Sequence, residues 1–380
     1  MTANARRTLP SLRGAAFVLL ALCAAMVGSV RASPRPSGAA PEQLVFPRDH
    51  GLHRSYRAEW WLLSGQLHAR DGRRFGYHAA FFRFALGARR QLYTAEFSLL
   101  DERSGQTVSV ERSVRPTTNS HPAGGGVFEL AVDQWRLAGH PLRAPRFESI
   151  DVRAGNPGNG IALNILPQKL PSPSPAFDGY AFTRMRASGS VMFGGRSYAV
   201  NGVSWLDHEY ERHAQTAARV GWERFELQFN DGRDVELFAT RLAGGRFAIR
   251  LPDGREIEAS SQLLPYGPDV PVAGMIVERN GAVRPLKLGA ASLAIEGDTF
   301  WHSPRTRASY PALWRLSIPA MRLDNAVAIA PLARDQEVIP DFGGVPFWWG
   351  AVELAQAEPP GLPLGTGSIV LTGYAIPTSL

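Results

Sequence analysis

Short runs of alternating apolar and polar residues dominate this chain, and long helical periodicity is scarce. The runs are rich in Val, Phe, Tyr, Trp and Leu, and clusters of Gly, Pro, Asn and Asp separate them. An alternation with a period of two places successive side chains on opposite faces of a strand, and clusters of turn residues end strands. The pattern therefore predicts an all-β protein.

Two segments predict β-hairpins that resemble each other. Residues 61–78 and residues 225–238 each hold two apolar-rich runs around an Asp-Gly-Arg turn, and a tryptophan opens each unit, Trp61 and Trp222. The Asp-Gly pair suits the positive φ angles of a tight hairpin turn. Because about half of the chain after the leader separates the hairpins, we expect two copies of one β-unit.

The spacing of these hairpins predicts two domains, 43–212 and 213–380. A length of roughly 170 residues suits an up-and-down antiparallel barrel of the calycin type, which closes its sheet and removes exposed edges. A single large sandwich is the alternative. The Pro-rich stretch 170–175 predicts a loop or an edge crossing, and a Pro/Gly-rich loop over 358–367 is expected to precede a last strand at 368–374.

The first 32 residues predict a cleaved signal peptide. Three arginines precede an apolar stretch at 15–30, and Val30-Arg31-Ala32 matches a cleavage site. The stretch is shorter than the roughly 20 residues that a membrane-spanning helix needs, which disfavours a membrane anchor. We expect a periplasmic protein with a flexible leader over 33–42. Arg6-Arg7 leaves twin-arginine export open beside the general route.

The charge and the cysteine content of the chain exclude some classes of binding partner and some kinds of site. The formal charge is +7, and the four arginines of the predicted signal peptide leave +3 for the mature chain. The remaining arginines are scattered and form no stripe, so we expect no nucleic-acid binding. Cys23 is the only cysteine and lies inside the predicted signal peptide, which leaves the mature chain without a thiolate or a disulfide. We expect membrane association to be peripheral at most.

The segment Trp205-Leu206-Asp207-His208-Glu209-Tyr210 carries the clearest candidate chemistry. A carboxylate among aromatic side chains loses hydration, and its pKa rises toward the value that a proton donor needs at neutral pH. With a strand period of two, Asp207 and Glu209 share one face and His208 takes the other. We therefore predict Asp207, His208 and Glu209 as the catalytic residues. A hydrogen-bonded tie without chemistry is the structural alternative.

The residues around this segment predict a ligand pocket. The predicted lining combines histidine, acidic and aromatic side chains: His50, His53, Glu59, Trp60, Trp205, Tyr210 and Trp222. The loop that carries His50 and His53 is expected to close over the carboxylates and to supply a balancing positive charge. Residues three apart point to opposite faces of a strand, so these two histidines converge on an ion only from a loop. We favour a tied loop over a metal site, and we expect no metal and no cofactor.

These segments, in this order, resemble the carotenoid 1,2-hydratase (hydroxyneurosporene synthase) family and its AttH-like, lipocalin-related relatives. The matching motifs run from residue 46 to residue 374: Phe46-Pro47-x-Asp49-His50-Gly51-x-His53, Glu59-Trp60-Trp61, Phe75-Gly76, Phe81-Phe82-Arg83, Trp205-Leu206-Asp207-His208-Glu209, Gly221-Trp222, Asp231-Gly232-Arg233, Trp301-x-Ser303-Pro304, Tyr310-Pro311, Asp335-Gln336-Glu337 and Leu371-Thr372-Gly373-Tyr374. The resemblance implies two tandem lipocalin-like barrels, an apolar ligand, no cofactor, and the addition of water across a carbon–carbon double bond. The chain departs from the family pattern at Glu96, Tyr210, Trp349 and Val370.

Three functions follow from these expectations. The first is a periplasmic protein that binds or shuttles a hydrophobic lipid-like or polyene-like ligand, because a small barrel can hold one such molecule. The second is a cofactor-independent hydro-lyase of the carotenoid 1,2-hydratase type, in which Asp207 or Glu209 protonates an alkene. The third is a structural partner of an envelope export or transporter complex. The sequence leaves open whether the protein is an enzyme.

Overall fold

The computed structural model describes most of the chain between residues 44 and 375. The described residues are 44–46, 48–86, 90–117, 129–140, 149–174, 177–211, 219–242, 246–250, 256–259, 270–271, 273–287, 290–297, 299–340, 345–359 and 361–375. The predicted signal peptide and leader lie outside them. Within these ranges, no helix combines the length and the apolar character needed to cross a membrane.

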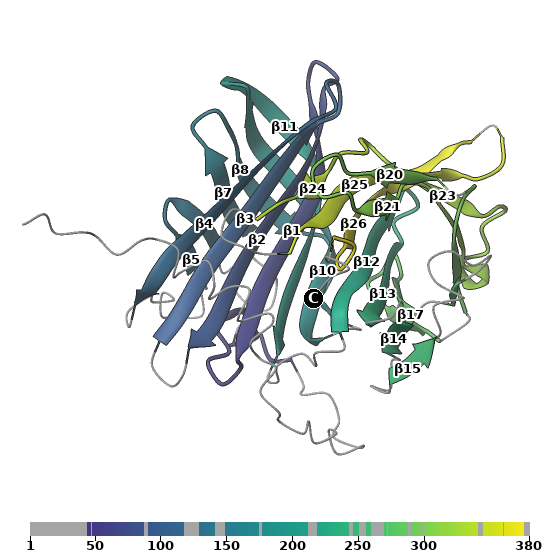
Figure 1. Ribbon diagram of the computed structural model, residues 1–380, viewed down its shortest axis with the longest axis horizontal. Coiled ribbons are helices and arrows are strands. Elements are labelled where there is room, and N and C mark those ends of the chain that lie inside the picture. The colour runs from purple at the N-terminus through teal and green to yellow at the C-terminus, as the bar shows by residue number, and fades with distance from the viewer. Residues whose placement is uncertain are drawn as a thin grey trace, which may run out of the picture.

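Strands β1 to β11 form the first antiparallel sheet. Their bounds are β1 Ala58–Ala69, β2 Arg74–Leu86, β3 Arg90–Asp101, β4 Gln106–Thr117, β5 Glu129–Val132, β6 Trp135–His140, β7 Ser149–Asn156, β8 Asn159–Pro167, β9 Ser172–Pro173, β10 Asp178–Phe193 and β11 Arg196–Glu211. The sheet order is β4-β3-β2-β1-β11-β10-β8-β7-β6-β5, with β9 beside β10. Pairing of β1 with β11 brings the two ends of this unit together, and the sheet curls into a barrel (Figure 1).

Strands β12 to β26 follow. Their bounds are β12 Arg219–Phe229, β13 Asp234–Leu242, β14 Arg246–Arg250, β15 Glu256–Ala259, β16 Val270–Pro271, β17 Ala273–Val277, β18 Val283–Leu286, β19 Ser292–Ile295, β20 Phe300–His302, β21 Ser309–Pro311, β22 Trp314–Ser317, β23 Val327–Pro331, β24 Glu337–Val338, β25 Phe347–Gln356 and β26 Pro363–Leu371. Most belong to a second antiparallel sheet, in which the first strand, β12, again pairs with the last, β26, and only β20 and β21 form a separate pair. Short 3₁₀ segments include Arg48–His50 and Pro319–Met321.

The two predicted Asp-Gly hairpins are confirmed. Gly72 joins β1 to β2 with a φ of 80°, and Gly232 joins β12 to β13 with a φ of 90°. Both angles lie in the left-handed region that glycine adopts without the strain of a Cβ atom. The repeated hairpin and the repeated closure of first strand on last strand confirm two tandem antiparallel units. The expected last strand is displaced, because β26 begins at Pro363 and ends at Leu371.

Each unit has its own core, and a shared face lies between them. In β1 the side chains of Trp61, Leu63 and Leu67 point into the first core, and in β12 those of Phe225 and Leu227 point into the second. Aromatic and aliphatic side chains fill the interior of the first barrel, and on the strands that lie beside the second barrel the alternate residues face it. Strands β1, β2 and β10 there contact β12, β13, β25 and β26.

Candidate functional site

Strands β1 and β11 supply residues to two polar clusters on opposite faces of one sheet. Their register pairs Trp61 with His208 and Leu62 with Asp207. Because side chains alternate along a strand, His208 points into the first barrel, whereas Asp207 and Glu209 point toward the second. The structure thus separates His208 from the two carboxylates, as the strand period predicts.

The inter-barrel cluster consists of Asp207, Glu209, Arg224, Glu226 and Glu236, all at most 2% exposed. Its centre is Arg224 of β12, whose Nη2 donates to both carboxylate oxygens of Glu209 at 2.6 and 2.8 Å. The Nη1 atom of Arg224 lies 3.0 Å from Asp207 Oδ2, and its Nε lies 3.6 Å from Glu236 Oε1. One guanidinium of the second barrel therefore contacts three carboxyl groups, two from the first barrel and one from the second.

The buried carboxyl groups of Asp207 and Glu226 face each other across the barrels. Two ionised carboxylates repel each other, and both are acceptors, so their close approach favours a proton on one of them. Burial raises the pKa of Asp207 to about 6, although Arg224 opposes the rise. Burial, together with the charge of Asp207, raises the pKa of Glu226 well above its usual range. The pair therefore holds a shared proton near neutral pH.

Glu236 of β13 lies beside Arg224 and close to the charges of Asp207 and Glu209. Burial raises its pKa well above the ordinary value, and the charge of Arg224 lowers it only in part. Neither oxygen of its carboxyl group accepts a hydrogen bond from the described residues. Buried polar atoms are nearly always hydrogen-bonded, so this corner of the cluster is suited to a donor from a ligand or a water molecule.

Aromatic side chains border the cluster on its solvent side. The Nε1 of Trp60 donates to Glu209 at 2.9 Å, and the Nε1 of Trp205 donates to Asp207 at 3.0 Å. The rings of Phe177 and Phe238 pack against the Arg224 guanidinium, whose central carbon lies 5.9 and 5.5 Å from their centroids. Trp60 and Phe177 are partly exposed, so the cluster approaches solvent along this aromatic border.

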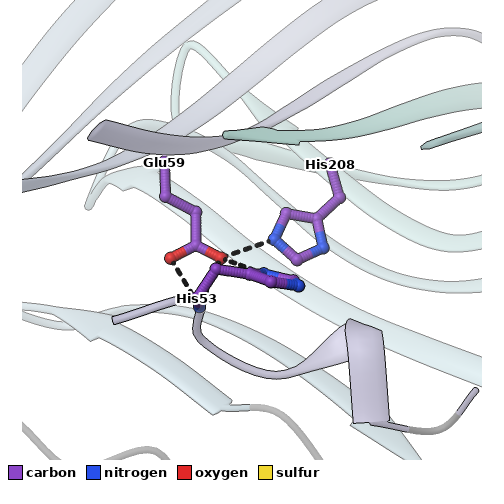
Figure 2. A group of neighbouring side chains, drawn as sticks. All are labelled: His53, Glu59 and His208. Carbon is purple, nitrogen blue, oxygen red and sulfur yellow. Dashed lines mark hydrogen bonds and ion pairs between the residues drawn. The ribbon is translucent and has the colours of Figure 1, made fainter. Parts of the chain in front are cut away.

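The histidine cluster lies inside the first barrel and consists of His53, Glu59 and His208. His53 Nδ1 and His208 Nε2 each lie 2.9 Å from the same atom, Glu59 Oε1. Figure 2 shows the three side chains converging from the loop before β1, from β1 and from β11. Glu59 and His208 are fully buried, whereas the side chain of His53 is 16% exposed.

Arg83 of β2 holds this cluster in place. Its Nε donates to Glu59 Oε2 at 2.8 Å, and its Nη2 donates to the backbone oxygens of His53 and Tyr56. Burial raises the pKa of Glu59, but hydrogen bonds from His208 and His53 and the charge of Arg83 together lower it to about 2. Glu59 is therefore an ionised carboxylate, and the loop that carries His53 is anchored to the barrel.

His50 also lies inside the first barrel, but its side chain contacts Tyr180 and not Glu59. Its Nδ1 lies 2.5 Å from the hydroxyl of Tyr180, which lies 3.3 Å from His208 Nδ1. Burial and the nearby charge of His208 lower the pKa of His50 to about 3, so its imidazole is neutral. The positive charge that was expected from the His50/His53 loop is therefore supplied to Asp207 and Glu209 by Arg224 instead.

The structure divides the predicted site residues between the two clusters. Trp60, Trp205, Asp207 and Glu209 border or form the inter-barrel cluster. His50, His53, Glu59, His208 and Tyr210 lie on the first-barrel side, where Tyr210 stacks on His53 with ring centroids 3.8 Å apart. Trp222 lies on the face of β12 that also carries Arg224, and its backbone N–H donates to Thr372 Oγ1 at 2.5 Å.

Five side chains that form or contact the two clusters were not predicted: Arg83, Tyr180, Arg224, Glu226 and Glu236. Arg224 and Glu226 lie in the second hairpin, which the sequence identified only as a structural repeat. Their alternation with Phe225 and Leu227 places charged residues on one face of a strand, a signal that ordinarily indicates a solvated surface. Only the approach of the first barrel buries that face.

Two curled antiparallel sheets with separate cores define a protein of tandem lipocalin-like barrels, with a buried polar site between them. The family model of AttH-like proteins matches residues 37–247 and 243–374, and the chain belongs to that family. A candidate AttH of Nitrosomonas europaea has the same fold, with 23% identity, a TM-score of 0.70, and coverage of 88% of this chain and 98% of its own. Kievitone hydratase of Nectria haematococca is also similar, with 10% identity, a TM-score of 0.58, and coverage of 89% and 96%. No curated protein matches the sequence.

Proposed function

We propose that this chain is an exported, cofactor-independent hydro-lyase that adds water to an alkene in an apolar small molecule. The observation that carries the proposal is the burial of four carboxyl groups, those of Asp207, Glu209, Glu226 and Glu236, around one cation, Arg224. A buried carboxyl group that keeps its proton at neutral pH is the state that a general acid requires.

The proposed reaction uses the inter-barrel cluster alone. The shared proton moves from Glu226 to one alkene carbon, and the other carbon becomes a tertiary cation. The neighbouring aromatic faces, Phe177 and Phe238 among them, stabilise that positive charge. A water molecule then bonds to the cation, and one of its protons returns to the carboxylate pair. The cluster ends in its starting state, and the product carries one added water.

The comparisons support the choice of chemistry only at the level of the fold. Kievitone hydratase is a hydratase by name, so tandem barrels of this shape can host a water-adding enzyme. Export is supported by the N-terminal arginines, the short apolar stretch and the small residues that follow it. A place in an envelope export or transporter complex is compatible with that location.

Binding without turnover is the second candidate, and the depth of the site favours it. Asp207 is 0% exposed and Glu226 is 2% exposed, so a substrate reaches them only if the aromatic border moves. A carrier of a hydrophobic ligand needs only the aromatic border and no access to the carboxyl groups. Side chains fill the first barrel, so the proposed ligand location is the aromatic border at the interface between the barrels.

The test begins with mass spectrometry of any apolar molecule that co-purifies with the mature chain. The purified protein is then incubated with acyclic polyenes and terpenoid alkenes in D₂O, and products are examined for one added water and for deuterium at carbon. We expect Glu226→Gln to remove a carboxyl proton donor and to lower turnover by about 100-fold or more. The exposed variant Glu358→Gln is the control and should retain full activity.

Two results would reject the hydro-lyase. Glu226→Gln could retain turnover while folded, which would show that the shared proton plays no part. Alternatively, the wild-type protein could bind an alkene tightly and return it unchanged, which would establish the carrier instead.

A further inference from the structure

We propose that His53, Glu59 and His208 form a binding site for one divalent transition-metal ion of the zinc class, inside the first barrel and separate from the inter-barrel cluster. The three side chains each offer one ligand atom, and these atoms all lie within 4.8 Å of one another. Two imidazoles and one carboxylate, with a further position for water, are a donor set that proteins use for Zn²⁺.

The spacing of the donor atoms suits a four-coordinate ion. Both imidazole nitrogens lie 2.9 Å from Glu59 Oε1. With metal–ligand bonds of about 2.0–2.1 Å in a tetrahedral site, neighbouring ligand atoms are about 3.3 Å apart. Each imidazole–carboxylate distance therefore needs to open by only a few tenths of an ångström, while the two imidazole nitrogens lie within 4.8 Å of each other. The exposed edge of His53 provides a route from solvent.

The second nitrogen of each histidine also faces an oxygen atom, at hydrogen-bond distance for His208 and slightly beyond it for His53. His208 Nδ1 lies 3.3 Å from the Tyr180 hydroxyl, and His53 Nε2 lies 3.7 Å from Asp49 Oδ1. Metal-binding histidines usually direct their other ring N–H to a carboxylate or another oxygen, which fixes the tautomer that leaves the ligating nitrogen free of a proton. Backbone and side-chain bonds of Asp49 to Val45 and Arg48 hold that carboxylate in turn.

Arg83 determines how the carboxylate would bind. Its guanidinium donates to Glu59 Oε2 at 2.8 Å, so the ion would bind Oε1, which also accepts the backbone N–H of His53 at 3.0 Å. The positive charge of Arg83 opposes a cation and moderates the affinity, but its bonds to the backbone of His53 and Tyr56 keep the loop close to Glu59. The site is thus preorganised at a cost in affinity.

The sequence favoured a tied loop over a metal site, and the pair of histidines that it weighed was a different one. The His50-x-x-His53 spacing drew attention to those two residues, but His50 contacts Tyr180 while His53 contacts Glu59. His208, which follows His53 by 155 residues, replaces His50 in the proposed ligand set. Only the pairing of β1 with β11 brings it there.

The experiment uses the mature full-length protein, stripped with a chelator and then equilibrated with ZnCl₂. Metal content after gel filtration, the affinity from calorimetry, and the visible spectrum with Co²⁺ are measured. We expect one bound ion per chain in the wild type. We expect His53→Ala, a change in a partly exposed loop, to weaken binding at least 100-fold, and Asp49→Asn to weaken it about 10-fold through the orientation of His53.

His140→Ala is the matched control, because His140 also pairs with a carboxylate, Asp151, but on the surface. It should bind the ion as the wild type does, and so should Glu226→Gln, whose change lies in the inter-barrel cluster. Loss of alkene turnover in Glu226→Gln with unchanged zinc binding would separate the two sites. Equal zinc retention by the wild type and His53→Ala, or no retention by either, would overturn the metal site and leave a hydrogen-bonded tie.

Discussion

Arg224 of the second barrel donates two hydrogen bonds to Glu209 of the first barrel, and water reaches neither side chain appreciably. This bond joins the two halves of the molecule at the place where Asp207, Glu226 and Glu236 also meet. The interface between the barrels is therefore organised by charge at its centre and by aromatic side chains around it.

Replacement of Arg224 tests that organisation. Arg224→Leu leaves buried carboxylates without their cation, and loss of one partner of a buried ion pair typically costs about 3–5 kcal/mol. We expect the free energy of unfolding, measured with urea, to fall by that amount. A double variant, Arg224→Leu with Glu209→Leu, should recover part of the loss because it removes the uncompensated charge. A change below 1 kcal/mol in the single variant would contradict this account.

Glu96 provides a pH test away from both clusters. It lies opposite Glu111 on neighbouring strands, and burial and then the charge of Glu111 raise its pKa from 4.5 to about 8. Between these values the folded state binds more protons than the unfolded chain, so its contribution to stability falls as the pH rises from 4.5 to 8. Glu96→Gln abolishes that loss.

We therefore expect the free energy of unfolding of Glu96→Gln to rise by about 1–3 kcal/mol relative to that of the wild type when the pH is raised from 5 to 8. This range is smaller than the full pKa shift would give, because part of the Glu96 side chain touches water. Chemical denaturation at both pH values measures the difference. Glu358→Gln, an exposed change, should show no such dependence. A constant difference between Glu96→Gln and the wild type would refute the raised pKa.

Tyr180 connects the two buried histidines of the first barrel. Its hydroxyl lies within hydrogen-bond distance of His50 Nδ1 and His208 Nδ1. Tyr180→Phe deprives both nitrogens of that oxygen, and we expect a loss of about 1–3 kcal/mol in stability. Tyr77→Phe removes a hydroxyl that bonds Ser204 and should cost less. If thermal and urea unfolding place both variants at the same stability, the histidine contacts contribute nothing beyond an ordinary hydroxyl pair.

Gly274 tests the close approach of β17 to β13. A Cβ atom at this position would lie 1.8 Å from the backbone oxygen of Glu236, a separation that real structures do not allow. Gly274→Ala must displace one strand, and we expect a loss of about 2 kcal/mol or more, with overpacking as its cause. Gly105→Ala is the comparison, since its Cβ meets nothing within 4 Å and only its φ of 66° opposes the change. Equal losses in the two variants would argue against a steric origin.

The local chemistry of the chain was sufficient to predict much of the fold. Asp71-Gly72 and Asp231-Gly232 require a tight turn whatever surrounds them, and the alternation on either side requires strands. The separation of His208 from Asp207 and Glu209 also follows from the period of a strand alone. The start of β26 did not follow, because Gly365 and Gly367 look like loop residues. They fit the strand because a Cβ at either position would lie within 2.6 Å of the backbone of β12.

The partners of each site residue depended on tertiary structure. The sequence placed His50 and His53 three residues apart, yet one contacts Tyr180 and the other Glu59. It gave no sign that Arg224 would meet Glu209, since alternating charged and apolar residues in β12 are equally suited to a solvated face. The alternation of side chains along a strand determines which face of the sheet a residue occupies, and it depends only on neighbouring residues. Whether that face is buried depends on the docking of the second barrel, which brings together residues far apart along the chain.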